Sequence, residues 1–411
     1  MSRGNVSFSL FFLLFFWVHA QTSLSQLYLE LEEKRIQITE GDLSGYYQLA
    51  AWCREKKLKQ RERKIYAAIL QRYPDEEKAH KKLGHLFKSG QWYSNEDAWR
   101  TATGKIRRLR EWVPQEEKES SWTLWHEHWL TPEEMKQLEQ GEALLAHEFE
   151  DHREFLTQHY RLWSTLKSKD TLELGKLIEQ AIRIWRQEAI PVEETPDPET
   201  LHLRILKNHS AFLEMVEDDI ETFPDYLKKA HGYFDGKECI LSYFHDAYRT
   251  RQILLHEGRH QYDALISKTY FWLPKWYSEG SAEYYAHHLW QKQKLSMGQL
   301  NPEENYSLYF VRKWLSQNKI RKVEDFLLHP EQNEVDASWY HNVWALVYYL
   351  KKSSYNTGFK QWEEALQTGK MLEAESQYQQ FLEKVAPNLK IFNQHYKQQL
   401  EIWSKLAPKH F

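Results

Sequence analysis

The segment Leu254–His260 (Leu-Leu-His-Glu-Gly-Arg-His) contains the pattern His-Glu-x-x-His within an apolar stretch. On an α-helix, residues i and i+4 lie on one face, so His256 and His260 can direct their ring nitrogens toward one metal ion. Imidazole nitrogens are common ligands of Zn²⁺. Glu257 lies beside that face, where a carboxylate can take a proton from a water molecule at the metal. The pattern therefore predicts a zinc site that activates water.

A catalytic zinc site takes three protein ligands and keeps a fourth position open for water. Downstream of the two histidines, the segment Lys275–Tyr284 (Lys-Trp-Tyr-Ser-Glu-Gly-Ser-Ala-Glu-Tyr) carries Glu279 and Glu283. This combination resembles the gluzincin metallopeptidases, whose third ligand is a Glu on a second helix after a spacer of this length. The resemblance implies that Glu279 completes a site for one Zn²⁺ per chain and that Glu283 orients a ligand histidine. The alternative is an amphipathic helix with two solvated histidines, followed by an unrelated acidic helix.

Length and composition indicate a folded chain without a nucleic-acid-binding charge pattern. The 411 residues suggest two domains, and a hydrophobic content of 41% with 18 Trp is ample for packed cores. The formal net charge of −4 lacks the basic footprint of nucleic-acid binding, so no nucleic-acid partner is expected. Cys53 and Cys239 are far apart in sequence, and we expect neither a disulfide nor zinc ligation from them.

The first twenty residues have the pattern of a secretory signal peptide. Arg3 provides a positive charge, Phe8–Val18 is an apolar core, and residues 18–20 (Val-His-Ala) resemble a cleavage site before Gln21. We therefore expect residues 1–20 to be removed and the protein to be exported, to the periplasm or the exterior. The apolar core is shorter than the about 20 residues that span a membrane, although an uncleaved anchor is the alternative. No stable membrane span is expected after cleavage.

Residues 21–95 are predicted to form a tetratricopeptide-like helical segment. Apolar residues recur every three to four positions in residues 41–90, and Pro74 marks a break between helices. One repeat at most is visible, whereas such arrays usually need about three. The segment is therefore expected to pack against the rest of the chain, with recognition of a protein partner as the alternative. Residues 96–156 are charged and are predicted to be a helical connecting region, with one helix starting at Thr131.

Two histidine clusters in this connecting region do not have the spacing of a chelating pair. His126 and His128 are two residues apart, which places them on opposite sides of a helix. His147 and His152 are five residues apart, about 140° around a helix. We interpret all four as surface or packing residues.

The remaining chain, residues 157–404, is predicted to be a single domain of small strands and many helices. Strands are expected at 160–164, 201–206, 232–234 and 239–243, with helices at 171–189 and 209–229. The motif helix is expected at about 247–265 and the next helix at about 276–290. Further helices are expected at 305–317, 323–328, 336–352, 356–367, 372–385 and 388–404. No glycine-rich phosphate loop or Gly-x-Ser-x-Gly elbow is present.

Residues 157–404 resemble secreted gluzincin-like (peptidase MA-type) zinc metallopeptidases. The resemblance rests on the strand Gly232-Tyr233-Phe234, the HEGRH motif, the WYSEGSAEYYA segment and the aromatic stretch that begins at Tyr340-His341. It implies a predominantly helical α+β fold: a zincin catalytic domain with a small mixed sheet and a C-terminal helical part, after a helical-repeat-like region. It also implies that a peptide substrate pairs with an edge strand, here at Gly232 and Tyr233. Tyr340 or His341 would then stabilise the oxyanion, with core packing as the alternative.

The resemblance implies zinc-dependent hydrolysis of peptide bonds. Zn²⁺ would polarise the scissile carbonyl and acidify a bound water, and Glu257 would transfer the water proton to the leaving amine. Arg259, inside the motif, is expected to form a structural ion pair. Two alternatives remain: an exported interaction scaffold on a zincin fold, and a metal-dependent amidohydrolase with a non-peptide substrate. The intact Glu257 counts against the scaffold, because degenerate sites often lose this base.

Overall fold

The computed structural model describes residues 30–407 apart from short gaps at 32–33, 36–37, 39–41, 57, 189–200, 217–228, 245, 268–269, 271–272, 301–305, 328–336 and 372–373. The expected signal peptide therefore lies outside the described residues. The chain divides into two compact units. Unit 1 comprises Met1–Trp122, Glu127–Trp129 and His209–Ala230, and unit 2 comprises Thr123–His126, Leu130–Asn208 and His231–Phe411.

Unit 1 begins with the helices predicted for residues 41–90: α2 (Leu43–Glu55), α3 (Lys59–Arg72) and α4 (Glu77–Leu83). The side chain of Asp42 caps α2 by accepting a hydrogen bond from the Gly45 N–H at 2.8 Å. Tyr66 and Ile69 of α3 bury their side chains against Ala50 of α2, which holds the two helices together. Unit 1 also contains α8 (His209–Met215), the described part of the helix expected at 209–229.

The prediction that residues 96–156 are helical is wrong. Three times in succession, beginning already at residue 86, the chain forms two short strands followed by a helical turn or helix. These are β1 (Leu86–Lys88), β2 (Gln91–Tyr93) and α5 (Glu96–Ala102); β3 (Lys105–Arg107), β4 (Trp112–Pro114) and η1 (Gln115–Glu117); β5 (Thr123–Trp125), β6 (His128–Leu130) and α6 (Pro132–Glu139). Within 96–156 the described helical elements are α5, η1 and α6, and the helix start predicted at Thr131 is confirmed, because Thr131 and Glu134 form a capping box there.

Tight turns and aromatic contacts explain why these segments are strands. Ser89 and Gly90 adopt φ of 54° and 83°, which reverses the chain between β1 and β2. The side chain of Lys88 then lies 3.8 Å from the centroid of the Trp99 ring. The four histidines interpreted as surface or packing residues lie on strands, turns and loops here; His128 is buried, and His152 stacks on Trp163.

A mixed six-stranded sheet forms one layer of unit 2, in the order β11-β12-β10-β9-β8-β7. β12 and β10 are parallel to each other, as are β10 and β9, and the remaining neighbours are antiparallel. The bounds are β7 (Leu144–Glu148), β8 (Arg153–Leu156), β9 (Tyr160–Ser164), β10 (Leu201–Leu206), β11 (Gly232–Phe234) and β12 (Glu238–Ser242). The prediction that the sheet begins near residue 160 missed β7 and β8.

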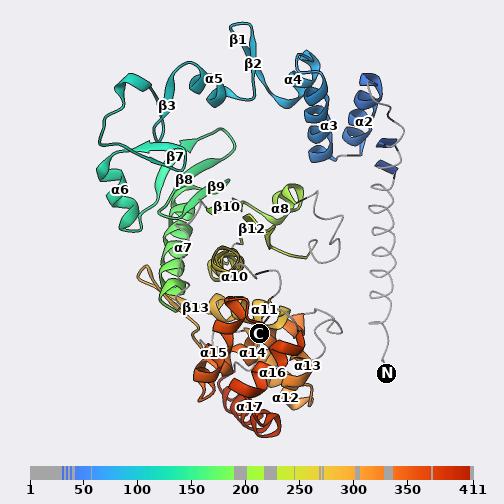
Figure 1. Cartoon of the computed structure of the whole chain (residues 1–411), viewed down its shortest axis with the longest axis vertical. Coiled ribbons are helices and arrows are strands. Elements are labelled where there is room, and N and C mark those ends of the chain that lie inside the picture. The colour runs from blue at the N-terminus through green and yellow to red at the C-terminus, as the bar shows by residue number, and fades with distance from the viewer. Residues whose placement is uncertain are drawn as a thin grey trace, which may run out of the picture. The chain divides into compact units, whose positions relative to one another are not determined.

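One face of this sheet is covered by α7 (Ser168–Glu188) and α10 (Ala247–Ile266), both close to their predicted bounds (Figure 1). Side chains alternate between faces along a strand, and Leu203 and Leu241 point into this core. The opposite face carries charged residues next to apolar ones, with an ion pair of 2.7 Å between Arg204 and Glu238.

The rest of unit 2 is helical, and helices dominate the described residues as predicted for an α+β chain. α11 (Lys275–Ala286) ends earlier than expected, because a hairpin of β13 (His288–Gln291) and β14 (Lys294–Met297) follows it. The C-terminal helices match the predicted ranges: α12 (Tyr306–Ser316), α13 (Val323–Leu327), α14 (Ala337–Lys352), α15 (Asn356–Gln367), α16 (Ala374–Lys384) and α17 (Leu389–Ser404).

Two smaller predictions can be compared with the described residues. Cys53, in unit 1, and Cys239, in unit 2, both have buried side chains. Within the described ranges, no helix combines the length and the apolarity that a membrane crossing requires.

Candidate metal centre

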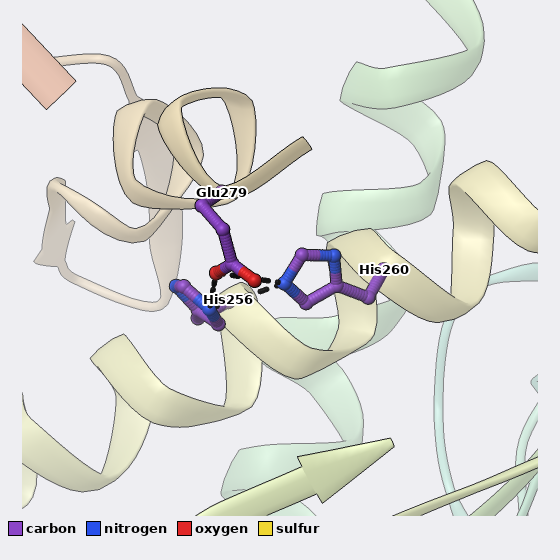
Figure 2. Close-up of side chains that lie close together, drawn as sticks. All are labelled: His256, His260 and Glu279. Carbon is purple, nitrogen blue, oxygen red and sulfur yellow. Dashed lines mark hydrogen bonds and ion pairs between the residues drawn. The ribbon is translucent and has the colours of Figure 1, made fainter. Parts of the chain in front are cut away.

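Helix α10 presents the two histidines of the motif on one face. The helix begins at Asp246, whose carboxylate accepts a hydrogen bond from the Tyr248 N–H at 2.9 Å. Ten residues later, His256 and His260 project from successive turns of the helix (Figure 2). Their Nε2 atoms lie 3.2 Å apart. Local helix geometry therefore brings together the two nitrogens as predicted.

Helix α11 supplies the carboxylate that faces these nitrogens. Glu279 points from α11 toward both imidazole rings (Figure 2). Its Oε2 atom lies 3.2 Å from His256 Nε2 and 3.4 Å from His260 Nε2. Among the described residues, this trio is the cluster with donors close enough together to hold a metal ion. The structure thus brings together the three residues predicted to be ligands.

The geometry of the trio fits a tetrahedral zinc ion. Zinc lies about 2.0–2.1 Å from imidazole nitrogen and carboxylate oxygen, so the ligand atoms of a tetrahedral site are separated by about 3.3 Å. The three separations here are 3.2, 3.2 and 3.4 Å. Oε2 of Glu279 is buried and makes no hydrogen bond of acceptable geometry, although both nitrogens are near. A cation bound between the three residues would satisfy this buried oxygen.

The histidines and glutamates of the cluster shift one another's pKa values strongly. Burial acts to lower the pKa of His256, but the carboxylates of Glu279 and Glu283 outweigh burial and raise it well above its usual range. Burial acts to raise the pKa of Glu279, but His260 and His256 hold it well below its usual range. In the absence of a cation, the cluster is therefore stabilised by a proton on His256.

A second layer of contacts fixes the orientation of the imidazole rings. Nδ1 of His256 lies 3.1 Å from Oε1 of Glu283, one helical turn after Glu279. Nδ1 of His260 lies 3.3 Å from the hydroxyl oxygen of Ser278. Ser278 is a hydrogen-bond partner of His260 Nδ1, whereas His256 Nδ1 lies within ion-pair distance of Glu283 without a hydrogen bond of good geometry; in both rings Nε2 is the nitrogen directed at Glu279. Glu283 lies where the resemblance implied; Ser278 was not anticipated.

Glu257, the expected base, is buried between α10 and β11. A Cβ atom added to Gly232 of β11 would lie 2.8 Å from Glu257 Oε1, so the strand backbone reaches the carboxylate. The Cys239 thiol of β12 donates a hydrogen bond to the Glu257 carbonyl oxygen at 3.2 Å. Burial raises the pKa of Glu257, while His256 and His260 act to lower it. A carboxylate with a raised pKa is suited to accept and release a proton near neutral pH.

The sequence offered two side chains that could stabilise an oxyanion, Tyr340 and His341, and the structure adds Tyr270. The ring of Tyr340 on α14 lies 6.3 Å from the His256 ring. His341, the other sequence candidate, is held by a hydrogen bond of 2.9 Å between Nδ1 and Ser307 and stacks on a phenylalanine of α12. Tyr270, which sequence reasoning missed, lies 6.4 Å from the His260 ring. Its position in the connection between the two site helices was the available signal.

The expected substrate strand and the expected structural arginine can also be placed. β11 is the terminal strand of the sheet as described, and Gly232 faces α10. Alternation along the strand places Tyr233 on the opposite face, away from Glu257. Arg259 forms a buried ion pair of 2.6 Å with Asp263 and lies 4.6 Å from the Tyr285 ring centroid, consistent with the structural role predicted for it.

Comparison with known proteins does not assign the chain to a family. No protein-family model matches the chain, and a search of curated proteins found no match.

Proposed function

We propose that unit 2 is a zinc-dependent peptidase of the gluzincin type, exported from the cell. The observation that supports it most strongly is the His256–His260–Glu279 triangle, whose edges equal those of a tetrahedral zinc site. Three protein donors leave a fourth position for water or substrate, whereas structural zinc sites use four protein ligands. This count favours a catalytic site over the scaffold alternative.

The residues around the trio have distinct parts in the proposed reaction. When bound, zinc lowers the pKa of a coordinated water and polarises a substrate carbonyl. Glu257 accepts the water proton and later delivers it to the leaving amine. The hydroxyl groups of Tyr340, whose ring lies near His256, and of Tyr270, whose ring lies near His260, are the candidate donors to the developing oxyanion. Glu283 and Ser278 keep the two imidazole rings in their ligating orientation.

The substrate is proposed to be a peptide in extended conformation. β11 is the terminal strand of the described sheet, and it lies against the helix that carries the base. The edge of such a strand offers backbone hydrogen-bonding groups that a peptide can use to extend the sheet. A small amide with no backbone to pair would not need this edge, which distinguishes the peptidase from the non-peptide amidohydrolase.

Metal analysis combined with a peptide-library digest tests the proposal. The purified protein should contain about one zinc per chain and cleave internal or terminal bonds in the library. Glu257→Gln should retain the zinc but lose about 10²–10⁴-fold in kcat, because the amide cannot accept the proton. His260→Ala should lose most of the zinc. A zinc-loaded protein that cleaves no peptide would support the scaffold, and a His260→Ala variant with full zinc content would refute the ligand assignment.

A further inference from the structure

We infer that Gly232 is a positioning residue for the base Glu257: the missing side chain at position 232 is the space that the Glu257 carboxylate occupies. This inference rests on the proposed function, since it assigns a part in the same reaction. It differs from the expectation that Gly232 admits the peptide itself.

The contacts around Gly232 show why this residue must lack a side chain. An added Cβ would lie 2.7 Å from Glu257 Cγ, 2.8 Å from Glu257 Oε1 and 2.6 Å from Ile253 Cγ2. Ordinary contact begins at 3.4 Å, so the Glu257 side chain would have to move by roughly 0.7 Å. The backbone of Gly232 is not left-handed, and an alanine could adopt it without strain. Space, not conformation, therefore requires glycine here.

The surroundings leave the base little freedom to move elsewhere. Glu257 is about 9% exposed, and the Cys239 thiol donates to its backbone carbonyl. Cys239 pairs with Phe234 across the β11–β12 ladder, and Gly232 pairs with Leu241. The hairpin thus contacts both the backbone and the side chain of the base. A change in one strand residue should alter the direction of the carboxylate.

Tyr270 connects the face of β11 that carries Gly232 to the proposed ligand His260. Phe234, two residues after Gly232 and on the same face of β11, packs edge-on against Tyr270 with ring centroids 5.9 Å apart. Tyr270 in turn lies edge-on to His260 at 6.4 Å. One face of β11 therefore contacts the base directly and a metal-site histidine through one ring. This arrangement makes β11 part of the catalytic geometry and not solely a docking edge.

The kinetic experiment compares Gly232→Ala with the unaltered protein on a peptide found in the library digest. Zinc content should stay at about one per chain, because the three atoms nearest to the new methyl group belong to Ile253 and Glu257 and not to a ligand. A misplacement of up to about 1 Å can cost about 10²-fold in rate. We expect kcat to fall by about that factor while KM stays within about twofold. A fall in affinity for the peptide with unchanged kcat would instead mean that Gly232 admits the substrate, and it would overturn the inference.

A thermal-unfolding cycle on the metal-free protein tests the contact without any need for activity. Gly232→Ala should lower Tm, and the loss should be smaller in a Glu257→Ala background, where one of the two colliding side chains is gone. Equal losses in both backgrounds would overturn the inference. If Gly232→Ala does not fold, Gly232→Ala with Ile253→Ala leaves Glu257 as the principal remaining contact, and the cycle is repeated there.

Controls separate this inference from the proposed function and from general destabilisation. Gly175→Ala on α7 is the matched variant, because its added Cβ meets Leu162 at 3.0 Å and no residue of the metal centre. It should leave kcat unchanged, whichever direction its change in Tm takes. If the unaltered protein neither binds zinc nor cleaves peptides, the proposed function fails and the base-positioning role fails with it. If the unaltered protein is active and Gly232→Ala is equally active, only the inference about Gly232 fails.

Discussion

Replacing Gly280 with Ala should weaken zinc binding although Gly280 is not itself a ligand. Gly280 follows Glu279 in α11, at the point where this helix packs on α14. An added Cβ would lie 2.6 Å from Val347 Cγ2 and 2.8 Å from the carbonyl oxygen of Val343. The valine side chain can adjust, but the carbonyl belongs to the backbone of α14. Helix α11 must therefore retreat by about 0.6 Å to reach the 3.4 Å of ordinary contact.

That displacement is large relative to the tolerance of a metal site. Ligand distances in zinc sites vary by about 0.2 Å, and Glu279 Oε2 now lies 3.2 and 3.4 Å from the two imidazole nitrogens. Loss of the groups that hold a ligand in place typically costs 10–100-fold in metal affinity. We expect the zinc dissociation constant to rise by about this factor. Overpacking should also reduce the free energy of unfolding by about 1–3 kcal/mol.

A competition titration against a fluorescent zinc chelator measures the affinity, and urea unfolding measures the stability. Ser281→Ala on the same helix is the matched control. The hydroxyl of Ser281 is buried without a hydrogen-bond partner, so its removal should leave both quantities nearly unchanged. An unaltered dissociation constant in a destabilised Gly280→Ala protein would refute the reasoning, because Glu279 would then not depend on the contact between α11 and α14.

Three further outcomes are expected. Glu283→Gln should bind zinc about 10–100-fold more weakly, since the charged partner 3.1 Å from His256 Nδ1 is lost, and equal affinity in the chelator titration would contradict this. Burial lowers the pKa of His288 to about 4, so folding favours its neutral form. The free energy of unfolding should therefore fall as the pH drops below the unfolded pKa of about 6.5, by about 2 kcal/mol at pH 5. In urea unfolding of the metal-free protein, His288→Asn should lose less stability between pH 7 and pH 5 than the unaltered protein, and an identical loss would exclude His288 as the cause. N-terminal sequencing of protein from its native host should begin near Gln21, whereas an intact Met1 on a membrane-bound form would replace export with anchoring.

The helices of the site were predictable because their signals are local. The motif helix was predicted at about 247–265, and α10 spans Ala247–Ile266. The C-terminal helices agree equally well, since each buries a stripe of apolar residues at helical spacing. These patterns require no knowledge of what the helix packs against.

The strands of residues 86–130 were not predicted, because their stabilising contacts are not periodic. Each strand is three residues long, too short to display alternation, and the intervening charges fit a helical pattern equally well. Two signals were present in the sequence. A tryptophan recurs on each second strand, at Trp92, Trp112 and Trp129, and Ser89-Gly90 is a turn dipeptide. The recurring tryptophan and the turn residues together indicate three hairpin-like units in this segment.

For the candidate site, the sequence alone determined that His256, His260 and Glu257 lie together, because the geometry of one helix fixes residues one and four positions apart. Only the tertiary structure decided the rest. The distance of Glu279 from the histidines depends on how closely α11 packs against its neighbours, and the approach of Gly232 to Glu257 depends on how β11 lies against α10. Such distances arise from side-chain volumes in separate elements, and no spacing along the chain encodes them.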